Sequence, residues 1–288
     1  MKMIAVDLDG TLLNYEGRIS PENAAAIRDA QSQGILVTIA TGRAYYDVQQ
    51  ICRQADILTP VIGANGATMH DQSGSSLHSV PMPRDKAMEV LEWLEAQEYY
   101  YEVMTDRAIY SPQNGHELMT IEMDRVLSSR TDLSLQTLLH AAEKQYAQHG
   151  ILRIPSYQNV PLDAEIYNIL AFSFMEPKLE AGRSRFRQDA ELTLVVSADH
   201  NFEVEHPEAS KGQALARMAE LHGIPLSEVM AVGDSYNDLS MLKIAGRSVA
   251  MGNAHQQIKD ACGEVTLSNQ ENGVAHAIRQ VLESSLQV

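Results

Sequence analysis

Met3-Ile4-Ala5-Val6, followed at once by Asp7-Leu8-Asp9-Gly10-Thr11, is the stretch that decides the fold of this chain. A short apolar run that meets acidic residues at its end is typical of a buried parallel strand. A helix signal follows, with Ser20 as N-cap and Pro21 at the first helical position. Residues 35–40 form a second apolar run. The sequence therefore predicts strand–helix–strand units and a parallel sheet.

The middle of the chain follows a different pattern. Strand candidates such as residues 99–105 and 166–175 stand among helical segments in an order typical of an α+β domain with an antiparallel sheet. After about residue 205 the αβ alternation returns. We therefore predict an α/β fold, with a Rossmann-like parallel-sheet core of residues 1–83 and 204–288 and an inserted α+β domain of residues 84–203.

Composition excludes several classes of protein. The formal net charge of −16 argues against a nucleic-acid partner, which normally requires a basic surface. No apolar run approaches the roughly 18 residues of a membrane span, and no secretory leader is evident. Cys52 and Cys262 belong to no metal-binding or disulfide pattern. We expect a cytoplasmic protein with no membrane partner and no obligate protein partner.

Two aspartates follow the first strand candidate. Residues i and i+2 of a strand share a face, so Asp7 and Asp9 are expected to point together at the carboxyl edge of the sheet, where open α/β sheets bind ligands. Adjacent carboxylates repel each other, and a cation or protonation of one of them relieves the cost. An Asp-rich turn without a role is the alternative. An EF-hand calcium loop is not indicated, because Leu12 occupies the position of its glycine.

A second acidic pair, Asp234 and Asp238, follows the strand candidate at residues 229–232. Asp238 alone is also interpretable as a helix N-cap. Thr41 and Lys211 occupy comparable positions, although a simple turn and a solvated surface lysine are the alternatives for them. A lysine at a helix N-terminus opposes the helix dipole, and a bound anion would offset that cost. Together these side chains predict a hard, oxygen-ligated metal, Mg²⁺, beside a phosphate group.

Four segments in this order resemble the motifs of the haloacid dehalogenase-like phosphohydrolase superfamily. They are DLDGT from Asp7, ATGR from Ala40, SKG from Ser210 and GDSYND from Gly233. VIGANGA from Val61 and VAMGNA from Val249 extend the similarity. The insertion between the motifs of Thr41 and Lys211 lies where the Cof-type (class IIB) subfamily carries its C2-type cap domain.

This resemblance implies a Mg²⁺-dependent phosphatase that forms an aspartyl phosphate. Asp7 would attack phosphorus, while Asp9 would protonate the leaving oxygen and then activate water. The implied metal ligands are Asp7, the Asp9 carbonyl oxygen, Asp234 and Ser235. The implied phosphate ligands are the Leu8 amide, Thr41, Gly42, Lys211 and Asn237, with Asp238 orienting Lys211 or a metal-bound water.

The resemblance leaves the small-molecule substrate open. Sugar phosphates, nucleotides and the phosphorylated ribityl intermediate of flavin synthesis all fit the class. A phosphotransferase or phosphomutase with the same core is the main alternative, and a non-catalytic phosphometabolite-binding protein is another. Tyr99, Tyr100, Tyr101 and Tyr110 could line a substrate cleft, but aromatic residues in strands more often serve packing.

Overall fold

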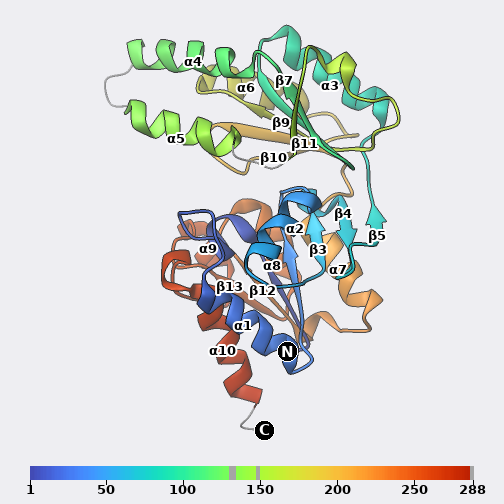
Figure 1. The fold of residues 1–288 in the computed structure, drawn as a ribbon, viewed down its shortest axis with the longest axis vertical. Coiled ribbons are helices and arrows are strands. Elements are labelled where there is room, and N and C mark those ends of the chain that lie inside the picture. Colours follow the sequence, from blue (N-terminus) through green and yellow to red (C-terminus); the bar gives the residue numbers. More distant parts are fainter. Residues whose placement is uncertain (130–133, 147–149, 286–288) are drawn as a thin grey trace. The chain divides into compact units, whose positions relative to one another are not determined.

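The computed structural model describes residues 1–129, 134–146 and 150–285. The chain forms two compact units, Met1–Ser79 with Glu208–Val288, and Val80–Pro207 (Figure 1). Among the described residues, no helix has both the length and the apolar character that a membrane span requires. Whether the two units are domains that fold separately stays a prediction.

The unit that contains both chain ends is built on an eight-stranded sheet of order β14-β13-β12-β1-β2-β3-β4-β5. The strands are β1 (Met3–Val6), β2 (Leu36–Ala40), β3 (Val61–Gly63), β4 (Thr68–His70), β5 (Ser76–Ser79), β12 (Val229–Gly233), β13 (Arg247–Ala250) and β14 (Glu264–Val265). The six strands from β14 to β3 are parallel, as predicted for the core. β4 and β5 were not predicted. β4 runs antiparallel to β3 because the tight turn at Asn65 and Gly66, both at positive φ, reverses the chain, and β5 in turn runs antiparallel to β4.

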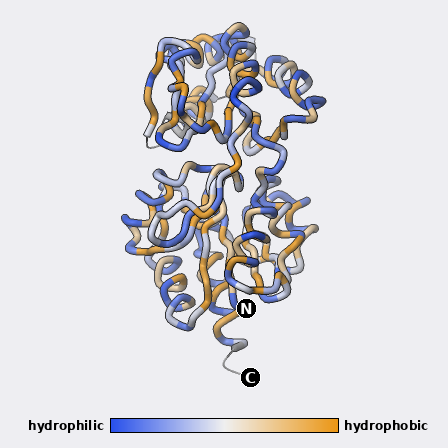
Figure 2. Tube along the Cα trace, turned by 90° about the vertical axis from the view of Figure 1, so that its right-hand side faces the viewer, coloured by the Kyte–Doolittle hydropathy of each residue, from blue (hydrophilic) through white to orange (hydrophobic). Residues whose placement is uncertain are grey.

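Helices connect these strands. They are α1 (Pro21–Ser32), α2 (Tyr45–Gln54), α7 (Lys211–Leu221), α8 (Leu239–Ile244), α9 (Gln256–Ala261) and α10 (Gly273–Ser285). α1 begins as predicted, since the Ser20 hydroxyl accepts a hydrogen bond of 3.1 Å from the Asn23 amide. β1 is fully buried, and its neighbours in the sheet supply much of the same apolar core. Hydrophobic segments accordingly run through the middle of this unit in Figure 2.

The second unit contains a six-stranded sheet of order β10-β11-β9-β6-β7-β8. Its strands are β6 (Tyr100–Thr105), β7 (Ile109–Pro112), β8 (Ile151–Ile154), β9 (Ile166–Phe172), β10 (Thr193–Val195) and β11 (Asn201–Glu205), and its helices are α3 (Arg84–Ala96), α4 (Gly115–Ser129), α5 (Leu135–Tyr146) and α6 (Glu176–Phe186). Neighbouring strands are antiparallel except β7 and β8. That pair is parallel because α4 and α5 lie between the two strands in the chain, and a crossover of this length returns β8 in the direction of β7. The α+β character predicted for the insertion is confirmed.

β11 was not predicted from the sequence. Its residues alternate between polar and apolar, with Phe202 and Val204 in an apolar cluster and Glu203 and Glu205 also buried. Acidic residues are uncommon in a buried strand, so the segment lacks the apolar run that marks the others. The predicted boundary after residue 203 would cut this strand, and the structure divides the units after Pro207 instead.

The tyrosines of the second unit are packing residues. Tyr99, Tyr101 and Tyr110 are buried in one apolar cluster, while Tyr100 belongs to another that includes Phe172. Tyr99 meets Phe202 edge-on, with ring centroids 6.0 Å apart. The packing interpretation of these tyrosines is therefore confirmed.

Candidate active site

The carboxyl ends of three neighbouring strands bring the predicted motifs together. In the parallel register, Val6 of β1 lies between Ile39 of β2 and Val232 of β12. Asp7, Thr41 and Asp234 each directly follow the last residue of one of these strands. Residues far apart in the sequence therefore emerge at one edge of the sheet, which is the usual position of ligand sites in such folds.

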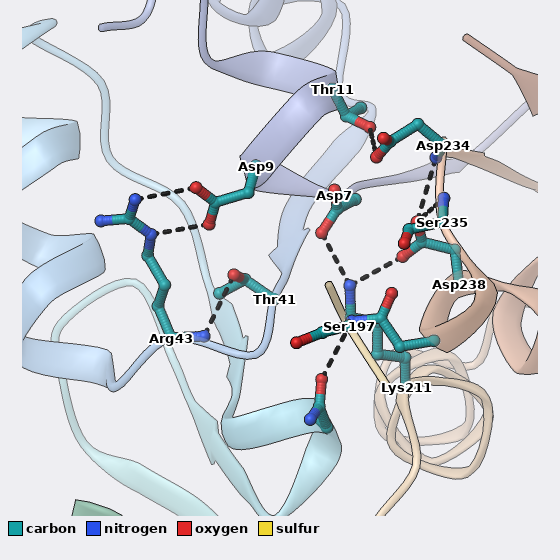
Figure 3. Close-up of polar contacts among 12 residues, drawn as sticks. Asp7, Asp9, Thr11, Thr41, Arg43, Ser197, Lys211, Asp234, Ser235 and Asp238 are labelled. Carbon is teal, nitrogen blue, oxygen red and sulfur yellow. Dashed lines mark hydrogen bonds and ion pairs between the residues drawn. The ribbon is translucent and has the colours of Figure 1, made fainter. Parts of the chain in front are cut away.

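Lys211 joins two of the carboxylates. Its ammonium group donates hydrogen bonds of 2.7 Å to Oδ1 of Asp7 and 2.7 Å to Oδ1 of Asp238 (Figure 3). The Lys211 side chain has no exposed surface, so these are ion pairs away from water. A solvated surface lysine, one of the two interpretations of its position, is wrong. Lys211 begins α7, and its helix is capped by Ser210, which accepts from the Gln213 amide at 3.0 Å.

Asp7, Asp234 and Asp238 form an acidic cluster. One carboxylate oxygen from each lies within 4.8 Å of the other two, a spacing that could hold a metal ion. Asp238 Oδ2 accepts 3.0 Å hydrogen bonds from the backbone amides of Asp234 and Ser235, which keeps its other oxygen on Lys211. Thr11 donates to Asp234 Oδ1 at 3.0 Å. The cluster is thus rigidly held by neighbouring donors.

Two glycines allow the loops to approach this cluster. A Cβ added at Gly10 would lie 2.4 Å from Asp234 Oδ2, and Gly10 also has a φ of +79°. A Cβ added at Gly233 would lie 2.6 Å from Cγ of Asp238. Neither position can carry a side chain without displacing a carboxylate of the cluster.

Burial and mutual repulsion shift the ionisation of the cluster. Burial raises the pKa of Asp7 well above its usual value; Asp238 adds to the shift and Lys211 opposes it. Burial, followed by the charge of Asp238, raises the pKa of Asp234 to about 6. Burial would lower the pKa of Lys211, but Asp238 and Asp7 raise it by more. Three carboxylates around one ammonium group carry excess negative charge, which a cation would relieve.

Asp9 lies in a different environment from Asp7. β1 ends at Val6, and Asp9 sits in a wide turn over Leu8–Leu12, so the expectation that the two side chains share a strand face is wrong. Both Asp9 oxygens accept from Arg43, at 2.7 Å from Nε and 2.8 Å from Nη2. Arg43 Nη1 also donates to the buried Asp47 at 2.7 Å. Figure 3 shows Asp9 directed towards Arg43 and away from Lys211.

The remaining predicted phosphate ligands lie around the same strand ends. Thr41 is buried, and its hydroxyl accepts from the Arg43 amide at 3.2 Å. Asn237 donates to Asn65 Oδ1 at 3.2 Å, and a Cβ added at Gly42 would lie 3.0 Å from that same oxygen. Asn65 therefore links the loop of Thr41 and Gly42 to the loop of Asn237. Leu8 is fully buried in the turn that contains Asp9.

Sequence reasoning missed Arg43, Asp47, Asn65 and Thr11 as site residues. Arg43 and Asp47 are four residues apart at the start of a helix, a spacing that favours an ion pair. Asn65 stands in the segment Val61–Ala67, where an Asn-Gly pair signals only a turn. Their part in the site depends on contacts with distant loops, which local pattern does not contain.

Comparison with known proteins identifies the family. The sequence profile of the haloacid dehalogenase-like hydrolases matches residues 4–278. The chain belongs to this family. It is 50% identical over 287 residues to phosphatase YwpJ of Bacillus subtilis, covering 98% of this chain and 100% of that protein. It is 40% identical over 283 residues to a second B. subtilis protein, 5-amino-6-(5-phospho-D-ribitylamino)uracil phosphatase YwtE, covering 98% of each.

A solved structure of a haloacid dehalogenase-like hydrolase from B. subtilis has a TM-score of 0.86 and 50% sequence identity, covering 97% of this chain and 99% of that one. The fold class and the Cof-type assignment predicted from the sequence are confirmed. So is the enzyme class, a phosphoric monoester hydrolase, because both B. subtilis relatives, which match along nearly the whole chain, are named phosphatases.

Proposed function

We propose that the protein is a Mg²⁺-dependent phosphatase of small phosphomonoesters that works through an aspartyl phosphate on Asp7. The observation that carries this proposal is the buried contact of Lys211 with Asp7 and Asp238, beside Asp234. It supplies a carboxylate nucleophile, a cation for phosphoryl oxygens and an acidic cluster in one place. We also propose a cytoplasmic location, as the sequence leads us to expect.

The donor set fits Mg²⁺. The cluster offers only oxygen ligands, which hard divalent cations prefer, and no thiolate or imidazole is among the three grouped residues. We assign the ion to Asp7, the Asp9 carbonyl, Asp234 and Ser235. When bound, it would neutralise charge on the transferring phosphoryl group. The raised pKa values of Asp7 and Asp234 support this assignment, because a nearby cation favours their ionised forms.

Each side chain of the site has its own role in the proposed reaction. Asp7 attacks phosphorus and the ester oxygen departs with a proton from Asp9; Asp9 later takes a proton from the water that cleaves the aspartyl phosphate. Lys211, Thr41, Asn237 and the backbone of Leu8 and Gly42 hold the phosphoryl oxygens. Asp238 keeps Lys211 in place, since it holds the ammonium group at 2.7 Å. Arg43 keeps Asp9 oriented through its two hydrogen bonds.

Removal and replacement of the metal tests this function. We expect a chelator to abolish phosphate release, Mg²⁺ or Mn²⁺ to restore it, and Ca²⁺ to inhibit it, because Ca²⁺ accepts a larger and looser coordination shell. Calorimetric titration of the metal-free protein with Mg²⁺ should give one site that is lost in Asp234→Asn. Full activity in excess chelator would refute the metal-dependent mechanism.

Several substrates fit, and the 40% identical relative favours one class. It is named for a phosphorylated ribitylamino uracil, so ribityl and related sugar-alcohol phosphates come first in our proposal, before sugar phosphates and nucleotides. A screen of such esters on the purified protein identifies the substrate by kcat/KM. Measuring free phosphate with and without an acceptor sugar separates hydrolysis from phosphotransfer, since a phosphotransferase would release little phosphate when the acceptor is present.

We assign substrate choice to the second unit. All the residues proposed above for chemistry lie in the first unit, whereas the sheet of the second carries buried polar side chains. Among these, Asn168 donates to Glu203 at 2.7 Å and to Glu205 at 3.3 Å. Substitutions on this sheet should change the ranking of substrates by kcat/KM. A uniform loss on all esters, including acetyl phosphate, would contradict the assignment.

A further inference from the structure

The turn that carries Asp9 is held by unusual hydrogen bonds. It closes through the Leu12 amide on the Asp7 carbonyl at 3.3 Å and the Leu13 amide on the Leu8 carbonyl at 2.9 Å. Because the turn is wide, its other carbonyl groups do not accept the regular hydrogen bonds of a helix or a sheet. Buried carbonyl groups need donors, so the remaining partners show what fixes the turn.

Three asparagine side chains supply those donors. Nδ2 of Asn253 donates to the Gly10 carbonyl at 2.8 Å, and Nδ2 of Asn269 donates to the Leu13 carbonyl at 2.8 Å. Nδ2 of Asn23 donates to the Leu12 carbonyl at 3.3 Å. The asparagines come from α1, from the loop after β13 and from the turn before α10. Three separate segments of the same unit therefore hold one short turn.

The orientation of Asn253 is set by its second contact. Its Oδ1 accepts from the Asn269 backbone amide at 2.9 Å, so its NH₂ group must face the Gly10 carbonyl. Asn253 belongs to the VAMGNA segment, to which the proposed chemistry gives no role. Unlike Asn23 and Asn269, which are buried, Asn253 is exposed, so its substitution does not place a charge in the core.

We propose that Asn253 is a positioning residue for Asp9, acting through the Gly10 carbonyl; this inference rests on the proposed function. Gly10 stands between Asp9 and Thr11, and Thr11 is bonded to Asp234. Asp234 leaves no room for a Cβ at Gly10, so the turn passes close to the acidic cluster there, and the hydrogen bond from Asn253 holds the Gly10 carbonyl. A shift of the Gly10 carbonyl would therefore be transmitted to Asp9, and misplacement of a reacting group by about 1 Å can cost up to 100-fold in rate.

Asn253→Asp is the informative variant. It keeps the oxygen that accepts from Asn269 and replaces the donor to Gly10 with an oxygen that repels the carbonyl. Gln72→Glu is the matched control, since Gln72 is also exposed and its NH₂ group donates to a backbone carbonyl, that of Leu58, at 3.0 Å. Asn253→Ala removes the donor without adding a charge, and so separates loss of the hydrogen bond from a new carboxylate near the acidic cluster.

The readout compares two esters and one structural probe. For both Asn253 variants we expect kcat on an alkyl phosphate to fall about tenfold or more. On p-nitrophenyl phosphate the loss should be smaller, because a good leaving group needs little proton donation. KM should stay within about threefold of the wild-type value. Amide hydrogen exchange should be faster than in the wild-type protein in residues 8–13, while Tm is unchanged. Gln72→Glu should match the wild-type protein in every measurement.

Two results would overturn the inference. One is a kcat within about twofold of wild type in both Asn253 variants; the other is an equal loss on both esters together with a lower Tm, which is the mark of a purely structural residue. Asp7→Asn is measured alongside. If that variant retains turnover, the proposed function itself fails; if it is inactive while the Asn253 variants are normal, only the present inference fails.

Discussion

Asp7 and Asp9 are two residues apart, yet they lie in two different electrostatic environments. Asp7 is 4% exposed and shares a single buried ammonium group with Asp238, beside a third carboxylate. The Asp9 side chain is 35% exposed, and both its oxygens are bound by one guanidinium group. Partners and burial, rather than position in the motif, therefore distinguish the two carboxylates, and they support the different roles that we propose for them. In the mechanism we propose, the half of the site around Asp7 binds and attacks the phosphoryl group, and the half around Asp9 transfers protons.

The largest expected effect lies in the Asp7 half. Asp7→Asn should lower kcat at least about 1,000-fold, because an amide is neither a nucleophile nor a good metal ligand. The fold should persist, as judged by circular dichroism, since the substitution keeps the shape of the side chain. Asp29→Asn, the same change at an exposed position of α1, serves as control. Activity of Asp7→Asn within tenfold of wild type would remove Asp7 from the role of nucleophile.

The Asp9 half should show a smaller and more selective loss. Asp9→Asn removes the proton donor but leaves the nucleophile, so kcat on alkyl phosphates should fall about 100-fold or more. The loss on p-nitrophenyl phosphate should be several times smaller, because its leaving group needs less protonation. Steady-state kinetics on both esters measures this ratio. Equal losses on the two esters would contradict the assignment of proton transfer to Asp9.

The substitution Arg43→Lys tests whether paired hydrogen bonds, rather than charge alone, orient Asp9. Lysine keeps the positive charge but cannot form the paired hydrogen bonds that a guanidinium group makes with a carboxylate. We expect kcat on alkyl phosphates to fall about tenfold, again with a smaller loss on aryl esters. Arg28→Lys is the control, since Arg28 is exposed and donates to the backbone carbonyls of Ala55 and Asp56. An Arg43→Lys enzyme with wild-type kinetics would show that charge alone orients Asp9.

The last expected effect changes stability rather than catalytic rate and is specific to the acidic cluster. Burial raises the pKa of Asp234 from 3.8 to about 6, so the folded, metal-free protein resists ionisation of this group. The free energy of unfolding of the wild-type protein should therefore decline as pH rises from about 4 to above 6. That of Asp234→Asn should lack this decline, because an amide does not ionise. In chelator, the variant should gain of the order of 2 kcal/mol relative to wild type across this window. Denaturant unfolding at a series of pH values measures the difference, and a constant difference from pH 4 to 8 would contradict it.

Sequence reasoning located the fold class and most of the site because both depend on local signals. The apolar run before Asp7, the cap at Ser20 and the glycine-containing turns at strand ends each report on their own neighbourhood. It missed β11, whose glutamates are buried on one face of a sheet, and β4 and β5, which extend the parallel sheet as an antiparallel pair. In each case the environment that makes the segment a strand is contributed by a neighbouring strand.

The parallel-sheet core, the insertion and the carboxylates, threonine and lysine at one sheet edge could all be predicted from the sequence. Strand ends in a parallel sheet meet at the same edge whatever the connections between them, so position after a strand was enough. The partners of these side chains came from the folded structure: Lys211 is shared by Asp7 and Asp238, Arg43 binds Asp9, and Asn253 binds Gly10 in the turn over Leu8–Leu12. These contacts join residues between 27 and 243 positions apart. Hydrogen bonds of 2.7–2.8 Å between them depend on how loops pack, which no local pattern encodes.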